Sequence, residues 1–170
     1  MMKKLLLALG LSAGLLSAVE FAGFEVSPEI GGSVGKVVSS EWDSYKPMNY
    51  GAYARVWLGA FGWVVAPQVK WDHYSEASSI GSYSNTQFGA SLGHNFGLVV
   101  LRLTPYVGVN RSTFSQTFAD TTSYNAGIKL KPMLLPLAVS LQYTYQNPDF
   151  VGTSTSFAMH NVQLMLGLHF

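Results

Sequence analysis

The chain has 170 residues, of which 11% are charged and 14% aromatic, and it contains no Cys. Soluble domains usually carry about a quarter charged residues, so this composition argues against an ordinary soluble protein. The missing Cys excludes a disulfide framework and thiolate chemistry, and a formal net charge of +1 gives no basic surface for nucleic acid.

The first eighteen residues, Met1–Ala18, have the features of a signal peptide. Lys3 and Lys4 precede an apolar run from Leu5 to Leu16, and Ser17-Ala18 offers small residues for cleavage, which we place within a residue or two of Ala18. Residues 19–170 then form one domain by size. Removing two of the ten basic residues leaves eight against nine acidic ones.

The remainder divides into segments in which apolar and polar or small side chains alternate. In residues 50–58, Ala52, Ala54, Val56 and Leu58 alternate with Gly51, Tyr53, Arg55 and Trp57, a pattern typical of a strand with one apolar face. Such strands cross a bilayer only as members of a closed barrel, where every backbone group is paired. Eight segments show the pattern: 24–35, 50–58, 63–71, 86–94, 98–110, 123–130, 135–145 and 157–170.

The connections between these segments alternate in length. Residues 59–62, 95–97 and 131–134 are short, whereas 36–49, 72–85, 111–122 and 146–156 are long and rich in Ser, Thr, Tyr and Asn. Short periplasmic turns and long outer loops are typical of bacterial barrels. We therefore predict an all-β, eight-stranded antiparallel up-and-down transmembrane β-barrel, a monomer with both termini in the periplasm.

Proline recurs in the strands that run outward. Pro28, Pro67 and Pro105 each lie between two apolar neighbours at a spacing of two, and Pro136 follows a displaced version of this pattern. Because Pro removes a ladder hydrogen bond, we expect a bulge or a locally missing bond at these positions.

Two stretches carry a family resemblance. Leu103–Val109 contains Pro-Tyr-Val-Gly, and the last strand ends on Leu166, Leu168 and Phe170. Both stretches resemble the small bacterial outer-membrane β-barrel proteins of the OmpA, OmpX and opacity-protein type. The resemblance implies the outer membrane as location, with its lipid and assembly machinery as partners, and Leu166, Leu168 and Phe170 as the assembly signal. It also implies a role in envelope structure and surface interaction through four outer loops, with an unknown surface ligand, no cofactor and no catalysis.

The inner face of the predicted barrel carries the charged residues of its strands. Opposite charges inside a narrow barrel should pair, because an unpaired buried charge is very costly. We expect a polar plug, with Glu29 favouring Arg55 because their strands are neighbours. Four basic against two acidic groups also leave open a small anion-biased, porin-like channel. The predicted lumen charge cluster is Glu25, Glu29, Arg55, Lys70, Arg102 and Lys129.

Histidine and the loop aromatics offer further hypotheses. The four His residues lack ligand spacing, so we predict no metal site. His73-Tyr74-Ser75 resembles the His-x-Ser of lipid A deacylases, which leaves a lipid A-modifying enzyme as an alternative, although a solvated loop is the preferred interpretation. Trp42 and Tyr45 are candidates for a sugar platform, and the remaining strand-end aromatics are expected to form interfacial girdles.

Overall fold

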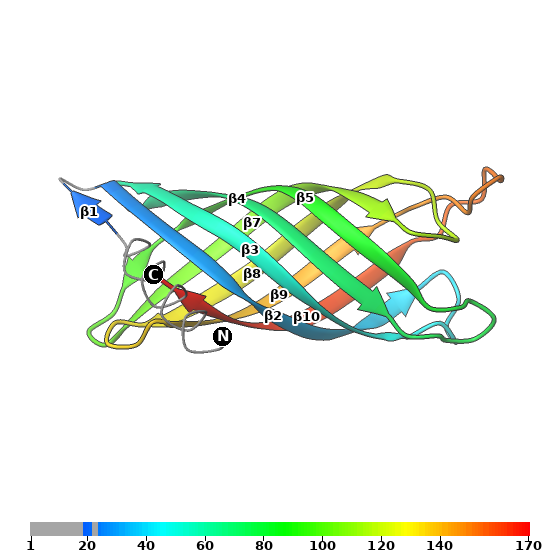
Figure 1. The fold of residues 1–170 in the computed structure, drawn as a ribbon, viewed down its shortest axis with the longest axis horizontal. Coiled ribbons are helices and arrows are strands. Elements are labelled where there is room, and N and C mark those ends of the chain that lie inside the picture. Colours follow the sequence, from blue (N-terminus) through cyan, green and yellow to red (C-terminus); the bar gives the residue numbers. More distant parts are fainter. Residues whose placement is uncertain (1–18, 22–23) are drawn as a thin grey trace, which may run out of the picture.

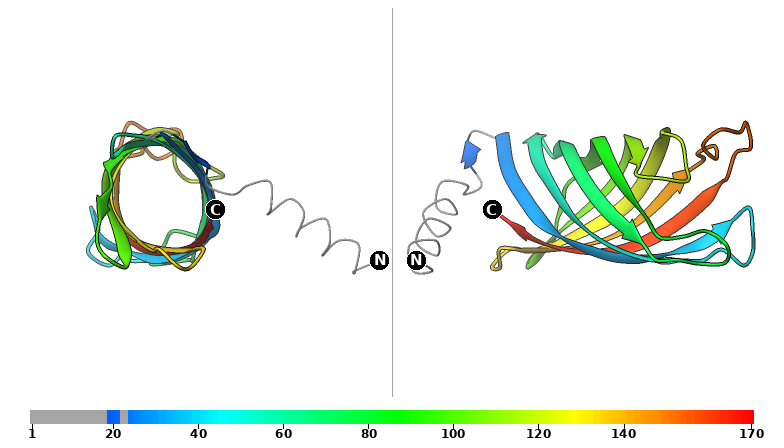
Figure 2. Two further views of the ribbon diagram at one scale, coloured as in Figure 1. Left: turned by 90° about the vertical axis from the view of Figure 1, so that its left-hand side faces the viewer. Right: turned by 45° about the vertical axis from the view of Figure 1, so that its right-hand side comes forward.

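The computed structural model describes residues 19–21 and 24–170, so the predicted signal peptide Met1–Ala18 lies outside the described residues. Eight long antiparallel strands form a closed barrel, since β2 pairs with β3 on one side and with β10 on the other (Figure 1; Figure 2, left). The strands are β1 (Val19–Phe21), β2 (Phe24–Ser40), β3 (Met48–Ala60), β4 (Trp63–Tyr74), β5 (Tyr83–His94), β6 (Phe96–Gly97), β7 (Leu101–Phe114), β8 (Thr121–Pro132), β9 (Leu137–Gln146) and β10 (Met159–His169).

The eight-stranded antiparallel barrel predicted from the sequence is confirmed, and its two small additions are β1 beside β2 and β6 beside β7. The short turns, β1 and the C-terminus lie at one end, here called the inner end, and the long loops lie at the other, the outer end (Figure 1). No helix in the described part of the chain is long and apolar enough to cross a membrane.

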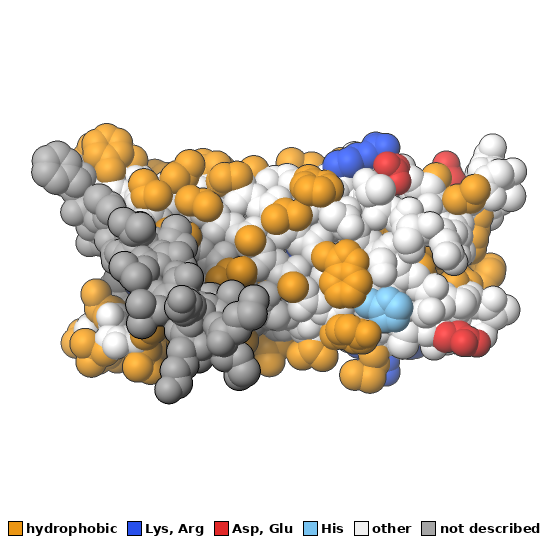
Figure 3. Space-filling model, in the orientation of Figure 1, with side chains coloured by type: hydrophobic (Ala, Val, Ile, Leu, Met, Phe, Trp, Pro, Cys, Tyr) orange, Lys and Arg blue, Asp and Glu red, His pale blue; other side chains and the backbone are white. Residues whose placement is uncertain are grey.

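The alternation of side chains orders the barrel wall into two faces. Along β9, Leu137, Val139 and Leu141 point outward and are exposed, whereas Ser140 and Gln142 are buried inside. Hydrophobic side chains therefore cover much of the outer wall, while charged side chains on the visible face lie toward the outer end (Figure 3). An apolar wall of this extent is typical of a barrel in contact with lipid.

In three of the four outer hairpins the strands extend further toward the outer end than the sequence pattern indicated. The predicted loops 36–49, 72–85 and 111–122 contract to 41–47, 75–82 and 115–120, whereas the predicted loop 146–156 becomes 147–158, since β10 begins two residues later than predicted. The physical reason is that the inward positions near the outer end are aromatic, as with Tyr74, Tyr83 and Phe114. The alternation of apolar outward and polar inward side chains, on which the prediction relied, is therefore lost there. At the inner end, β7 begins at Leu101 and β9 at Leu137, later than predicted, because residues 98–100 and 133–136 form the turns.

The prolines interrupt pairing without a bulge. The ladder between β3 and β4 is broken beside Pro67, and it resumes in the same register on both sides. The β2–β10 ladder stops at Glu29, next to Pro28, and the β5–β7 ladder stops at Tyr106, next to Pro105. We expected either a bulge or a locally missing hydrogen bond at the prolines, and the missing bond is correct. The register shift that marks a bulge in the described ladders lies at His160/Asn161 instead.

Candidate functional site

The interior of the barrel is filled by stacked layers of side chains. The layer at the inner mouth is built on Glu25, whose carboxylate accepts hydrogen bonds from Arg102 at 2.7 Å, Ser27 at 2.8 Å and Asn95 at 3.1 Å. These partners come from β2, from β7 and from the connection between β5 and β6, so the ion pair ties opposite walls of the barrel together.

Glu29 is the centre of the next layer and is fully enclosed. One carboxylate oxygen accepts two hydrogen bonds from Arg55, at 2.6 and 3.0 Å, and one from the Tyr53 hydroxyl at 2.8 Å. The other oxygen accepts a bond from the Trp57 indole at 2.8 Å and lies 3.2 Å from His169 Nδ1.

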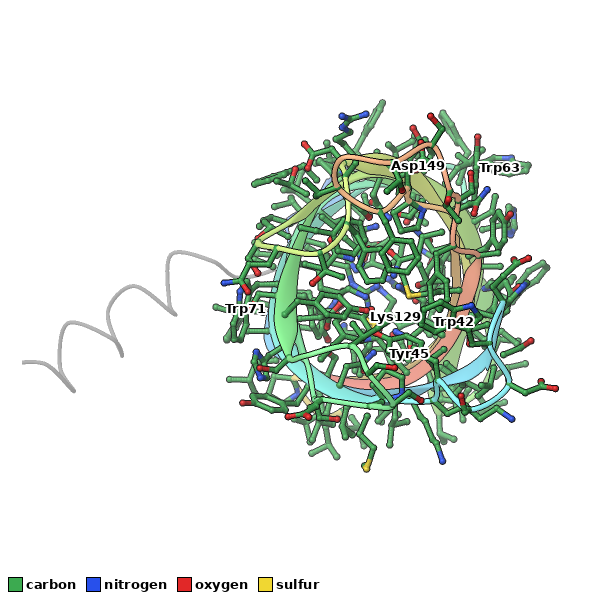
Figure 4. All side chains as sticks on the ribbon, turned by 90° about the vertical axis from the view of Figure 1, so that its right-hand side faces the viewer. Trp42, Tyr45, Trp63, Trp71, Lys129 and Asp149 are labelled. Atoms are coloured by element: carbon green, nitrogen blue, oxygen red, sulfur yellow. The ribbon has the colours of Figure 1, made fainter. Side chains whose placement is uncertain are left out.

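Lys129 completes this layer as a second buried cation. Its ammonium group lies 3.7 Å from the Glu29 carboxylate and 3.6 Å from the ring centre of Trp57. Figure 4 shows Lys129 inside the ring of strands. Arg55 and Lys129 thus share one carboxylate, and cation–π contacts with Trp57 supplement the charge compensation.

A third layer lies nearer the outer end and contains an acid that the sequence analysis placed in a loop. Asp72 is fully buried and forms an ion pair with Lys70 at 3.1 Å. It also accepts hydrogen bonds from Gln163 at 2.9 Å and Ser33 at 3.1 Å. Lys70 donates in addition to Gln163. With Asp72 inside, the excess of basic groups that suggested an anion-biased path becomes smaller.

The outer mouth is closed by an aromatic cap that the sequence analysis missed. The cap, as named here, consists of buried residues from the strand ends and all four long loops, with Tyr83 and Phe118 near its centre. Tyr74 and Tyr83 stack with ring centres 4.8 Å apart, and Phe118 stacks on Phe157 at 5.5 Å. Its members are Val37, Tyr45, Tyr74, Ile80, Tyr83, Phe114, Phe118, Phe157 and Met159, with Ala77 and Phe150 packed against them.

Tyr45 illustrates how the cap holds a loop. Its ring packs edge-on against Phe157 at 5.2 Å, and its hydroxyl donates to the Tyr83 hydroxyl at 2.9 Å. Burial raises the pKa of Tyr45 to about 12, and the hydrogen bond with Tyr83 acts in the opposite direction. Tyr45 is therefore part of the packing and cannot be a surface sugar platform, which corrects that hypothesis for this residue.

Backbone hydrogen bonds join the loops to one another. Ala119 N donates to Asp149 O at 2.7 Å and Val151 N donates to Thr117 O at 2.9 Å, which links the loops 115–120 and 147–158. Glu41 N donates to Ala158 O at 3.1 Å and so connects the first and last loops. The four loops form one packed unit.

Trp42 and a rim of carboxylates are the exposed features of this unit. The Trp42 ring is 43% exposed and stacks on Phe150 with ring centres 5.7 Å apart. Trp42 and Asp149 belong to the outer loops 41–47 and 147–158, and Figure 4 labels both in a view from the outer end. The exposed acids of the loops are Glu41, Asp43, Glu76, Asp120 and Asp149, and the exposed bases near them are Lys46 in the first loop and Lys36 and Arg111 on the outer parts of β2 and β7.

The remaining predicted positions are placed as follows. His73 lies on the outer wall, where its ring contacts those of Tyr50 and Trp71, while the Ser75 hydroxyl donates to the carbonyl of Met48. The tripeptide is thus not arranged as a base and its nucleophile. Leu166 and Leu168 are exposed on the outer wall of β10 and Phe170 follows this strand, donating its N–H to Pro28 O at 2.9 Å. No metal-binding cluster occurs among the residues that the structure describes.

No protein-family model and no curated protein matches the chain. Its closed eight-stranded barrel, with a polar filled interior and an apolar wall, has the fold of the small outer-membrane β-barrel proteins. Neisserial surface protein A (NspA) superposes with a TM-score of 0.62 at 11% identity, covering 85% of this chain and 95% of that one. Ail, the attachment invasion locus protein of Yersinia pestis, gives a TM-score of 0.53 at 16% identity, covering 88% of this chain and 100% of that one. The predicted likeness to this class of outer-membrane barrels is confirmed at the level of the fold.

Proposed function

We propose that this protein is a non-enzymatic outer-membrane barrel that supports the envelope and presents a recognition surface through its four outer loops. The observation that carries the proposal is the aromatic cap, which packs four separate loops around a single core. A surface whose loops are already ordered loses little conformational freedom on binding a partner. NspA and Ail, a surface protein and an attachment protein by their names, share the fold that presents these loops.

The chemistry of the loop surface suggests which partners it accepts. The loops that carry and adjoin the Trp42–Phe150 pair expose five carboxylates, so a polyanion would be repelled and a cationic or neutral ligand with an apolar face would be favoured. Aromatic side chains supply large, rigid contact areas of the kind enriched in binding hot spots.

Binding by the purified barrel in lipid nanodiscs tests this proposal. Arrays of glycans and of basic and acidic peptides provide the probes, and Trp42→Ala with Asp43→Asn and Asp149→Asn is the altered loop surface. We expect wild-type signals on neutral or basic probes that the triple variant loses. Phe61→Ala, a change of an exposed aromatic residue in the turn at the other end, is the matched control. Equal binding by the triple variant would refute the loop surface.

The orientation of the barrel gives a second expected result. An epitope tag inserted between Asp43 and Ser44, within the outer loop, should react with antibody on intact cells, because the long loops face outward. The same tag within the turn 61–62 should react only after the outer membrane is permeabilised. Reversed labelling of the two tags would overturn the orientation.

Removal of Phe170 tests the proposed assembly signal. We expect the amount of assembled barrel in cells to fall far more than the stability of barrel that has already folded, since burial of one such side chain is worth only about 1.5–3 kcal/mol. The measurements are heat-modifiable migration of the barrel from cells and urea unfolding of refolded protein. Phe24→Ala, another partly exposed aromatic residue near the inner end, serves as the control. Normal assembly without Phe170 would contradict the signal.

A further inference from the structure

Two turns at the inner end of the barrel are unusually apolar. Residues 98–100 are Leu-Val-Val and residues 133–135 are Met-Leu-Leu, and the two turns, here called the inner turns, are joined by a hydrogen bond from Met133 N to Val100 O at 3.1 Å. Val99 is 97% exposed and Leu134 is 92% exposed. Hydrophobic side chains gather at the lower left of Figure 3, at the end where Figure 1 shows these turns.

Turns that face water are normally built from Gly, Pro, Asn, Asp and Ser, which favour the turn backbone and are well solvated. All six residues of the inner turns are instead large and apolar, and each is more than half exposed. An exposed apolar patch of this kind marks contact with a membrane or a partner.

The height of the apolar wall identifies the partner as lipid. On β8 and β9 the outer boundary is marked by the outward-facing rings of Tyr124 and Tyr145, which pair across the two strands. From Tyr145 to the start of β9 at Leu137, and from Tyr124 to the end of β8 at Pro132, a tilted strand descends only about 20 Å. Outer-membrane barrels have an apolar band of about 25 Å. The wall on this side reaches that height only if the inner turns are counted in it.

The apolar surface is also continuous from the wall to the turns. Residues 133–139 contain no charged residue, and Leu135, Leu137 and Val139 are all exposed. The charged residues of this region, Arg102 and Lys131, are only partly exposed and alternate with the outward-facing leucines of their strands. The turns therefore extend the lipid-facing wall rather than form a separate patch.

We propose that the inner turns are inserted in the periplasmic leaflet of the outer membrane, in contact with phospholipid acyl chains. The inner mouth, with the Glu25–Arg102 ion pair, then opens at the depth of the lipid headgroups rather than in the periplasm. This inference rests on the membrane location proposed above, and it is independent of what the outer loops bind.

Spin labels on single cysteines test the insertion, and the chain has no Cys of its own to interfere. Val99→Cys and Leu134→Cys report on the turns in refolded barrel in phosphatidylcholine vesicles. Leu166→Cys, on the exposed wall of β10, is the lipid control, and Ser154→Cys, in an exposed outer loop, is the water control. The measurement is the ratio of collisions with oxygen, which concentrates in lipid, to collisions with a water-soluble nickel chelate.

We expect labels at positions 99 and 134 to give ratios close to that at 166 and several-fold above that at 154. Ratios equal to that at 154, with 166 still in lipid, would overturn the insertion while leaving the membrane location intact. Nickel access at 166 would refute both. Broadening of the spectra of labels at 99 or 134 that disappears on dilution with unlabelled protein would show a second copy on the turns, which also overturns the proposal.

Discussion

Replacing Glu29 with Gln should lower the free energy of unfolding by about 3–5 kcal/mol, because the change leaves two buried cations without their shared counterion. Arg55 and Lys129 both face this carboxylate, and side chains of both partners are nearly inaccessible to solvent. Gln keeps the size of the side chain, so the loss reports on charge rather than on a cavity. Urea unfolding of the barrel in lipid vesicles measures the effect. A neutral Glu29→Gln would contradict the buried cluster.

A double-mutant cycle identifies the partner that matters most. Neutralising the main cationic partner of Glu29 together with Glu29 itself should recover much of the lost stability, because that cation is then no longer left buried without a counterion. Two hydrogen bonds to Arg55, against a 3.7 Å separation from Lys129, predict stronger coupling for Arg55→Gln than for Lys129→Gln. Arg111→Gln, whose partner Asp120 is also exposed, should add to Glu29→Gln without coupling. Coupling below about 0.5 kcal/mol for both lumen cations would refute the pairing.

Conductance adds a separate readout for the same variants. If the charge cluster obstructs a path through the lumen, Glu29→Gln combined with Arg55→Gln should raise the conductance of planar bilayers above that of the wild type. Unchanged conductance in this double variant would argue against a gate and favour the interpretation of the cluster as a plug.

Replacing Phe157 with Ala should open the aromatic cap without unfolding the barrel. The Phe157 ring is 1% exposed and contacts the rings of Trp42, Tyr45, Phe118 and Phe150. Truncating a buried Phe costs about 3–5 kcal/mol, and each 1.4 kcal/mol is tenfold in an equilibrium constant. When local opening is fast, cleavage follows the open population, so chymotrypsin should cut the outer loops faster by a factor of roughly a hundred to a few thousand.

The control for this prediction is a change of the same size at the other end of the molecule. Phe61 is 81% exposed in the turn between β3 and β4 at the inner end, so Phe61→Ala should leave cleavage of the outer loops unchanged. The barrel of the Phe157→Ala variant should retain its own urea transition, because the strand pairing below the cap is untouched. Loop cleavage at the wild-type rate would show that the ring contacts do not hold the loops closed.

The strands and their faces could be predicted because a two-residue period with one apolar face leaves a clear pattern. That pattern places Glu29 and Arg55 on the inner face of neighbouring strands, and the structure pairs them in register. It failed at the outer ends, where Trp71 points outward and Tyr74 inward, so both faces are aromatic. Continuing the alternation by one step beyond Lys70 would have brought Asp72 inside.

The cap could not be predicted in the same way. Tyr45, Phe118 and Phe157 meet although they lie in three different loops, and loops carry no periodicity that relates one to another. Their contact depends on the closure of the barrel, which brings the ends of all hairpins to one rim. Individual aromatic residues in a long loop are equally compatible with exposure to solvent, as Trp42 shows.

The pairing of β2 with β10 determines when the barrel can close during folding. Ile30 faces Leu168 across this seam, so the first long strand finds one of its two neighbours only when nearly the whole chain has been synthesised. Long-range closure of this kind is slow, because the entropy of joining distant segments must be overcome before the contacts form. Until then both strands present an unpaired edge and apolar side chains, which promote aggregation. The unfolded chain therefore has to be kept from contacting other copies on its way to the membrane. The last step of folding is the pairing of β2 with β10.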